Sequence, residues 1–115
     1  MKHYKNLPEL INDKNDYPPS GRVFIKKSKI NDIVNAEYWV ISSKESLEQD
    51  FEEDEKGARI PISLVKFDVM RFLDVQIFKD IIDNKIEHNP ELSLNETPVF
   101  AEAIMYYLEN DDFLD

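Results

Sequence analysis

The spacing of apolar residues changes along the chain, and this change limits the folds that the sequence can adopt. In the first half, residues 22–27 and 36–42 are rich in the β-branched and aromatic side chains that favour strands. In the second half, apolar residues recur every three or four positions, as on one face of a helix. Strands followed by helices predict an α+β fold, in which a small antiparallel β-sheet packs against two or more amphipathic α-helices.

Two helices are predicted after residue 73 from their caps and apolar stripes. Asp74 is placed to cap the first helix, which ends at Asn89-Pro90, and Leu73 and Phe78 have the spacing of a hydrophobic staple. Thr97 is expected to cap the second helix, with Pro98 at its first position. The apolar stripes are Val75, Phe78, Ile81, Ile82 and Ile86 on the first helix, and Phe100, Ala103, Ile104, Tyr107 and Leu108 on the second.

The two β-rich runs are predicted to pair as an antiparallel hairpin across the loop of residues 28–35. We expect the helices to cover one face of the sheet and to leave the other face open to water. Tyr38 and Trp39 are neighbours on one strand, so their side chains point to opposite faces. One of the two should therefore be exposed and available as an aromatic anchor for a partner.

Two shorter helical segments are expected in the first 57 residues. Asn6 can cap a short helix with Pro8 in its first turn, and the polar residues 13–16 end it. The segment Ser46-Leu47-Glu48-Gln49 has a capping-box spacing, which predicts one or two helical turns that Gly57 would stop.

The segment of residues 60–73 is compatible with either a strand or a helix. Ile60, Ile62 and Leu64 alternate as they would in a strand, whereas Pro61 is a good opener of a helix. We favour a short helix near residues 61–67 and a strand near residues 69–72.

The length and composition predict a single domain over residues 1–115, since 42% of the residues are hydrophobic and one core typically serves roughly 100 to 150 residues. The chain contains no cysteine, which suits a reducing compartment and excludes disulfides and thiolate metal sites. It also lacks an apolar run of signal-peptide or membrane-span length. We therefore expect a cytoplasmic protein that does not interact with membranes.

The sequence contains no convincing catalytic or cofactor-binding motif. It has no cysteine nucleophile, only two glycines for a phosphate-binding loop, and two histidines that share no motif. The acidic runs Glu52-Glu53-Asp54-Glu55 and Asp111-Asp112 lack the glycine that folds a calcium loop around its ion. We expect a binding protein without enzymatic activity, cofactor or metal, and a glycosidase-type pair of carboxylates is the least favoured alternative.

The charge of the chain is strongly uneven. Residues 1–44 carry eight Lys/Arg and five Asp/Glu, for a net charge of +3, whereas residues 45–115 carry six and nineteen, for a net charge of −13. Nucleic acid is a poor direct partner for such a field, because phosphate binding depends on Lys and Arg. A basic protein is a better one.

Two acidic clusters are candidates for contacting that protein. The first acidic cluster spans residues 48–55 and contains Phe51; the second spans residues 109–115 and contains Phe113 and Leu114. Carboxylates around an aromatic anchor suit an interface with a basic surface, although acidic runs also serve solubility alone. The candidate contact residues are Trp39, Glu48, Asp50, Glu52, Glu53, Asp54, Glu55, Glu109, Asp111, Asp112 and Phe113.

Residues 72–84 and 103–113 resemble small bacterial immunity proteins of contact-dependent growth inhibition. The resemblance implies a protein that binds the C-terminal domain of a cognate toxin, often a nuclease, and blocks it in the cytoplasm. A nuclease attracts phosphates with Lys and Arg, so an acidic inhibitor could occupy its groove. Two alternatives stay open: a nucleic-acid mimic that inhibits a DNA-binding enzyme, and an acidic adaptor or oligomerisation module. The sequence leaves the oligomeric state undetermined.

Overall fold

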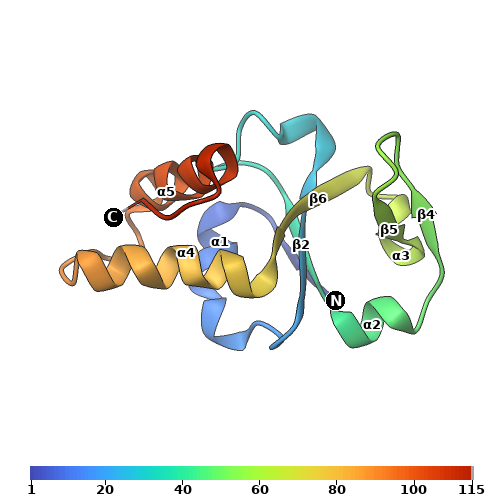
Figure 1. The fold of residues 1–115 in the computed structure, drawn as a ribbon, viewed down its shortest axis with the longest axis horizontal. Coiled ribbons are helices and arrows are strands. Elements are labelled where there is room, and N and C mark those ends of the chain that lie inside the picture. Colours follow the sequence, from blue (N-terminus) through green and yellow to red (C-terminus); the bar gives the residue numbers. More distant parts are fainter. Residues whose placement is uncertain (115) are drawn as a thin grey trace.

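A computed structural model describes residues 1–114 and confirms the predicted α+β class (Figure 1). The strands are β1 (Lys2–Tyr4), β2 (Gly21–Lys26), β3 (Tyr38–Ser42), β4 (Phe51–Glu53), β5 (Arg59–Pro61) and β6 (Val69–Asp74). The α-helices are α1 (Leu7–Asn12), α2 (Ser43–Leu47), α3 (Ile62–Val65), α4 (Val75–His88) and α5 (Thr97–Asn110), and the short 3-10 helices are η1 (Lys14–Asp16) and η2 (Lys27–Lys29).

The main sheet has the strand order β1-β3-β2-β6, and every neighbouring pair is antiparallel. The predicted hairpin of residues 22–42 is confirmed as β2 and β3, in which Phe24 pairs with Trp39. The register between β2 and β6 shifts between Val23 and Phe24, so that Phe24 lies opposite Arg71. Strands β4 and β5 form a separate two-stranded hairpin at one end of the molecule (Figure 1).

One face of the main sheet carries the larger apolar core. Side chains from β2 and β3 meet α1, α4 and α5 on this face, as the apolar stripes predicted, except that Leu108 is 40% exposed and lies outside this core. The two predicted helices are confirmed, and Asp74 caps α4 by accepting hydrogen bonds from the backbone N–H groups of Gln76 and Ile77 at 2.8 and 3.3 Å. Figure 1 shows α4 and α5 together on this side of the sheet. The fully buried members of this core include Leu7, Ile25, Tyr38, Phe78, Ile82, Phe100 and Ile104.

The opposite face of the sheet is covered as well, so the prediction that it is open to water is wrong. Strand β5 and helix α3 pack over it, and Ile60 and Leu64 join Trp39 in a second apolar core. The Trp39 ring stacks on Phe67, with ring centroids 5.2 Å apart. Tyr38 is 0% exposed and Trp39 is 3% exposed, so neither is the exposed anchor that we expected. The helix stripes could not reveal this cover, because it comes from a segment of ambiguous pattern.

The predicted helix starting at Ser46 is wrong in position. Helix α2 ends at Leu47, and its capping box is formed by Ser42 and Glu45. Ser42 and Ser46 lie in similar local patterns, but Ser42 is the last residue of strand β3, so the chain turns into the helix one turn earlier. Of the acidic residues that follow, Glu52 and Glu53 belong to strand β4, and Gly57 serves the turn between β4 and β5 with a positive φ of 80°.

The remaining short elements agree with the sequence except at one boundary. Asn6 caps α1 by accepting from the N–H of Glu9 at 3.0 Å. The segment of residues 60–73 contains the favoured short helix and strand, α3 and β6, after one additional short strand, β5. Helix α5 begins at Thr97, so Glu96 and not Thr97 occupies the N-cap position, and no side chain makes a capping bond there.

The N-terminal strand is fastened to the turn after α1 by one carboxylate. Asp13 accepts a hydrogen bond from the Tyr4 hydroxyl and an ion-paired bond from Lys2 Nζ at 3.0 Å. The Tyr4 hydroxyl and the Lys2 ammonium hold the pKa of Asp13 below its ordinary value. Asp13 thereby secures edge strand β1, which pairs with β3 over only three residues.

We predict that the second core contributes strongly to stability. Replacing the fully buried Leu64 by Ala should lower the free energy of unfolding by about 2 to 5 kcal/mol, because it removes apolar contacts and leaves a cavity. The control is Leu47→Ala, since Leu47 is 87% exposed and its loss should cost under about 0.5 kcal/mol. Urea denaturation measures both, and equal effects of the two substitutions would contradict a packed second core.

We also predict a pH-dependent contribution from Asp13. Its folded pKa is depressed, so the carboxylate stabilises the fold above its unfolded pKa of about 3.9, and this stability is lost as pH falls through the lower folded pKa. Asp13→Asn should therefore cost roughly 1 kcal/mol near neutral pH and less at a pH near 2. Urea denaturation at both pH values checks this, with Glu91→Gln at an exposed loop carboxylate as control.

Candidate functional site

The structure places the two acidic clusters on opposite sides of the main sheet. The first surrounds β4, which lies at one end of the molecule, whereas the second follows the end of α5 on the other side of β2 and β6 (Figure 1). Asp115 lies outside the described residues. The candidate residues therefore form two separate surfaces.

The first acidic cluster is partly compensated by neighbouring cations. Glu55 forms an ion pair with Lys27, and Glu53 lies opposite Arg59 in the β4–β5 ladder. Asp54 accepts hydrogen bonds from the backbone N–H groups of Lys56 and Ala58, both at 2.9 Å, and these bonds lower its pKa. Asp54 is thus a turn residue of the hairpin. The exposed remainder of this cluster consists of Glu48, Asp50, Glu52 and Phe51, whose ring lies 4.4 Å from the Arg59 guanidinium.

The described carboxylates of the second acidic cluster form no such ion pair. Within residues 1–114, Glu109, Asp111 and Asp112 are not paired with any cation, and the sequence has no Lys or Arg after Lys85. All three lie at the C-terminal end of α5, where the partial negative charge of the helix dipole favours cations. Their position is therefore electrostatically unfavourable for the isolated protein.

Exposed apolar side chains accompany these carboxylates. At the helical spacing of α5, Met105 and Tyr106 share the outward face with Glu102 and Glu109, while Leu108 flanks it. Met105, Tyr106, Leu108 and Phe113 are each between 37% and 40% exposed. Large apolar side chains that stay accessible among charges are typical of a protein-binding surface. We call this surface, made of Glu102, Met105, Tyr106, Leu108, Glu109, Asp111, Asp112 and Phe113, the α5 surface.

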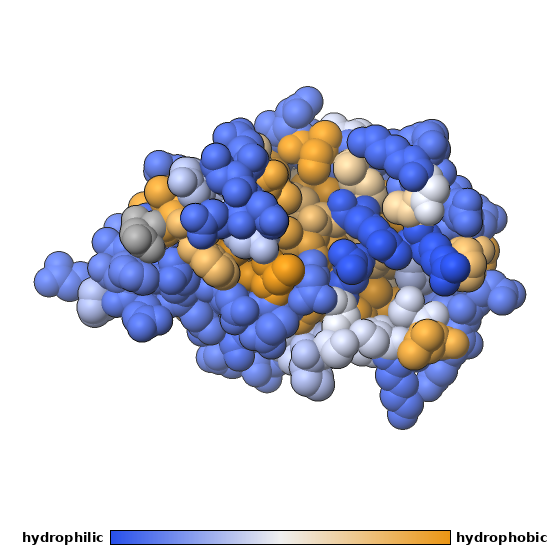
Figure 2. Space-filling model, in the orientation of Figure 1, coloured by the Kyte–Doolittle hydropathy of each residue, from blue (hydrophilic) through white to orange (hydrophobic). Residues whose placement is uncertain are grey.

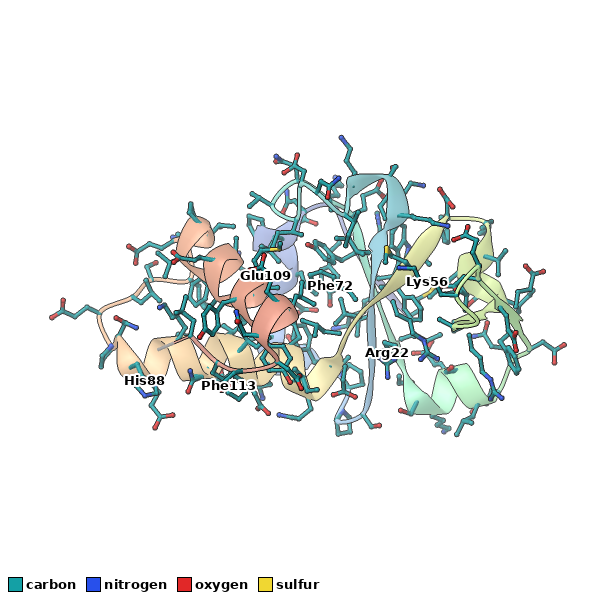
Figure 3. All side chains as sticks on the ribbon, turned by 45° about the horizontal axis from the view of Figure 1, so that its top comes forward. Arg22, Lys56, Phe72, His88, Glu109 and Phe113 are labelled. Carbon is teal, nitrogen blue, oxygen red and sulfur yellow. The ribbon has the colours of Figure 1, made fainter. Side chains whose placement is uncertain are left out.

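The chain direction after α5 sets the position of Phe113. Asp111 ends the helix in the left-handed conformation, with φ of 54°, and its N–H bonds the Tyr107 carbonyl at 2.8 Å. The chain then folds back, so that the Phe113 ring packs on Tyr107 with centroids 5.4 Å apart and Leu114 contacts the larger core. Figure 3 shows Phe113 beside α4 and α5. These contacts hold the segment after α5 against the surface.

A pocket of about 530 Å³ lies at the other end of the molecule, and none of the sequence patterns indicated it. Its floor is formed by Phe24 and Ile41 of the main sheet, and one wall by Ser43, Ser46 and Leu47 of α2. Three arginines, Arg22, Arg59 and Arg71, line it together with Phe51. We call it the arginine pocket. In Figure 2, strongly hydrophilic side chains surround a recess with apolar surface at its base, between the sheet and the β4–β5 hairpin.

The three arginines affect one another electrostatically. Burial lowers the pKa of Arg71, and the guanidiniums of Arg22 and Arg59 lower it as well, while the Asp54 carboxylate opposes them. Arg71 Nε donates to the Arg59 carbonyl at 3.2 Å, which fixes the position of this side chain. The positive charges are therefore held near one another inside a protein whose net charge is −10.

The sequence did not indicate the arginine pocket, because its lining residues come from six separate elements. Arg22 and Arg71 each interrupt an apolar strand pattern, and this was the only available signal. Which face of the sheet these side chains share depends on the register shift between β2 and β6, a feature of tertiary structure.

We predict that the second acidic cluster lowers stability. Glu109→Lys should raise the free energy of unfolding by about 0.3 to 1 kcal/mol, because it places a cation at the C-terminal end of α5. The same change at Glu102, which lies in the first half of the helix, should not be stabilising. Urea denaturation at low ionic strength measures both variants, and a loss of stability in Glu109→Lys would contradict the prediction.

Neither metal ligands nor membrane-spanning elements add to these two surfaces. Among residues 1–114, no group of three or more His, Asp or Glu side chains is arranged to hold a metal ion. No helix in this range has the length and apolar character needed to cross a membrane. Comparisons of the chain with protein-family models, with curated proteins and with solved structures found no match.

Proposed function

We propose that this protein is an immunity-type inhibitor that binds a basic bacterial toxin domain, of the nuclease class, through the α5 surface. The observation that carries the proposal is the combination of uncompensated carboxylates with exposed apolar side chains on and after one helix. The resemblance of residues 72–84 and 103–113 to immunity proteins includes the end of this helix.

Electrostatics favour the α5 surface over the first acidic cluster. In the first cluster, Lys27 and Arg59 already oppose carboxylates of the hairpin, so a basic partner would have to compete with them. At the α5 surface, Lys or Arg side chains from a partner would relieve repulsion among Glu109, Asp111 and Asp112 and would complement the helix dipole. A second copy of this chain would bring more carboxylates to the same face, so self-association there is disfavoured.

The apolar side chains supply the affinity that surface charge alone does not provide. Exposed ion pairs each contribute little in water, whereas a few buried aromatic side chains commonly dominate an interface. Tyr106 and Phe113 are positioned to be such anchors, and both are 37% exposed in the free protein. The ring contact with Tyr107 limits the freedom that Phe113 would lose on binding.

The mechanism that follows is stoichiometric occlusion. A nuclease groove must display Lys and Arg to hold the phosphates of its substrate. Carboxylates of the α5 surface would occupy these cations, and the helix would exclude RNA or DNA from the groove. Long-range attraction would speed the encounter and weaken as salt screens it.

The proposal predicts that a toxin domain is encoded next to this gene, and that domain is the partner used in the test. Co-expression measures survival, and calorimetry at low and high salt measures affinity. We expect the wild-type protein to protect cells and to bind more weakly at high salt. The double variant Glu109→Lys/Asp112→Lys and the single variant Phe113→Ala should each weaken binding at least tenfold, since each removes roughly 1.4 kcal/mol or more.

Matched controls come from the other end of the molecule. Glu52→Lys/Glu53→Lys makes the same change of net charge in the first acidic cluster, and Phe51→Ala removes another exposed phenylalanine. Both should bind nearly as tightly as the wild type. If these controls lose affinity while the α5 variants retain it, the interface lies at the hairpin, and if no toxin domain associates with the wild type, the proposal fails.

A further inference from the structure

The arginine pocket has the size and depth of a small-molecule site. Its volume of about 530 Å³ falls within the typical range of roughly 300 to 1,000 Å³ for such sites. Fixed hydrogen bonds hold its walls: Gln49 Nε2 donates to the Glu45 carbonyl at 3.2 Å, and Gln49 Oε1 accepts from Ser63 N–H at 2.8 Å. These bonds connect the end of α2 to α3 beneath the hairpin, so the pocket exists before any ligand arrives.

The charges that line the pocket are strongly unbalanced. Arg22, Arg59 and Arg71 contribute three positive charges, and Asp74 is the single carboxylate among the described lining residues. The Asp74 carboxylate is already used, since its Oδ1 accepts the two N–H bonds that cap α4. The lining therefore has a net charge of about +2, opposite in sign to the whole protein.

Most guanidinium donors of these arginines have no acceptor. Within residues 1–114, Arg22 forms no hydrogen bond or ion pair, and Arg71 donates only through Nε. Figure 3 shows Arg22 in the space between the sheet and α2. Arginines that repel one another and retain donors for a ligand attract anions, and guanidinium forks match the oxygens of phosphate well.

Apolar groups next to these donors define the rest of the ligand. Phe24 and Ile41 form the floor of the pocket, and the Phe51 ring lies under the Arg59 guanidinium at 4.4 Å. Phe51 is 46% exposed, so its ring is accessible to a ligand. A planar or apolar body could pack on these residues while its charged end reaches the arginines.

From the convergence of Arg22, Arg59 and Arg71 above an apolar floor, we propose that the arginine pocket binds a small organic phosphomonoester. The phosphoryl group, with a charge of about −2, neutralises the net charge of the lining, and the organic body packs on Phe24, Ile41 and Phe51. This site is independent of the proposed toxin inhibition, because α5 lies on the other side of the main sheet (Figure 1).

The test is a titration of the full-length protein with four probes: phenyl phosphate, inorganic phosphate, benzoate and benzyl alcohol. We expect phenyl phosphate to bind most tightly, inorganic phosphate and benzoate more weakly, and the neutral alcohol not at all. Arg22→Gln and Arg71→Gln should each weaken phenyl phosphate at least tenfold. Lys29→Gln, which removes an exposed charge beyond the other end of β2, should change the affinity less than twofold.

Chemical-shift mapping uses the wild-type protein, so its result does not depend on whether the variants fold. Phenyl phosphate should shift the backbone amide signals of Gly21, Ser43 and Ser46 in the pocket, and leave those of Met105 and Leu108 on α5 unchanged. The proposed site would be wrong if the shifts were confined to other regions or if no saturable binding were seen. It would also be wrong if Lys29→Gln lost as much affinity as the pocket variants. If benzoate bound as tightly as phenyl phosphate, the preference for a phosphoryl group would be contradicted. If inorganic phosphate bound as tightly as phenyl phosphate, the proposed contacts with an organic body would be contradicted.

Discussion

Strands β2 and β3 are apolar on both faces, and most of the architecture follows from the need to cover each face. Val23, Ile25, Tyr38 and Val40 belong to the larger core, while Phe24, Trp39 and Ile41 belong to the smaller one. Because successive side chains of a strand point to opposite faces of the sheet, covering one of these sets leaves the other set exposed. Helices α1, α4 and α5 cover the first set, and the segment from β5 to α3 covers the second.

The second cover is shorter than the sheet, and the arginine pocket occupies the part of the face that it leaves open. Beyond Phe24 and Ile41 the strands continue to Arg22 and Ser42, where α2 turns away from the sheet. A guanidinium can bury part of its stem against an apolar floor while its head reaches water, which makes Arg22 and Arg71 suitable at such a boundary. The same strand alternation therefore accounts for both the core and the cationic lining.

Charge is separated along the molecule in a way that the net value of −10 conceals. The end that carries the first acidic cluster also holds the cations Lys27, Arg59 and Arg71, so its field is mixed. The end at α5 carries carboxylates and no Lys or Arg after Lys85. A basic partner and a small anion would thus be attracted to different ends, which is why the two proposals can be tested separately.

The sequence by itself determined the α+β class, the β2–β3 hairpin, the helices α4 and α5, and Asp74 and Asn6 as caps. These features depend on local periodicity and on groups only a few residues apart. It also indicated the second acidic cluster and Phe113, because both belong to one continuous segment at the end of a helix. It misplaced the helix near Ser46, since Ser42 and Ser46 offer similar capping patterns and only the end of β3 selects between them.

Tertiary structure alone decided the burial of Trp39, the cation partners of the first acidic cluster and the arginine pocket. Each depends on residues from distant segments: Leu64 and Phe67 covering Trp39, Lys27 reaching Glu55, and Arg22, Arg59 and Arg71 meeting on one face. Strand pairing and the register shift between β2 and β6 bring these side chains together. The packing of the whole sheet between its two apolar covers stabilises this arrangement. Local sequence patterns do not predict contacts between distant segments, so these features could be identified only in the folded structure.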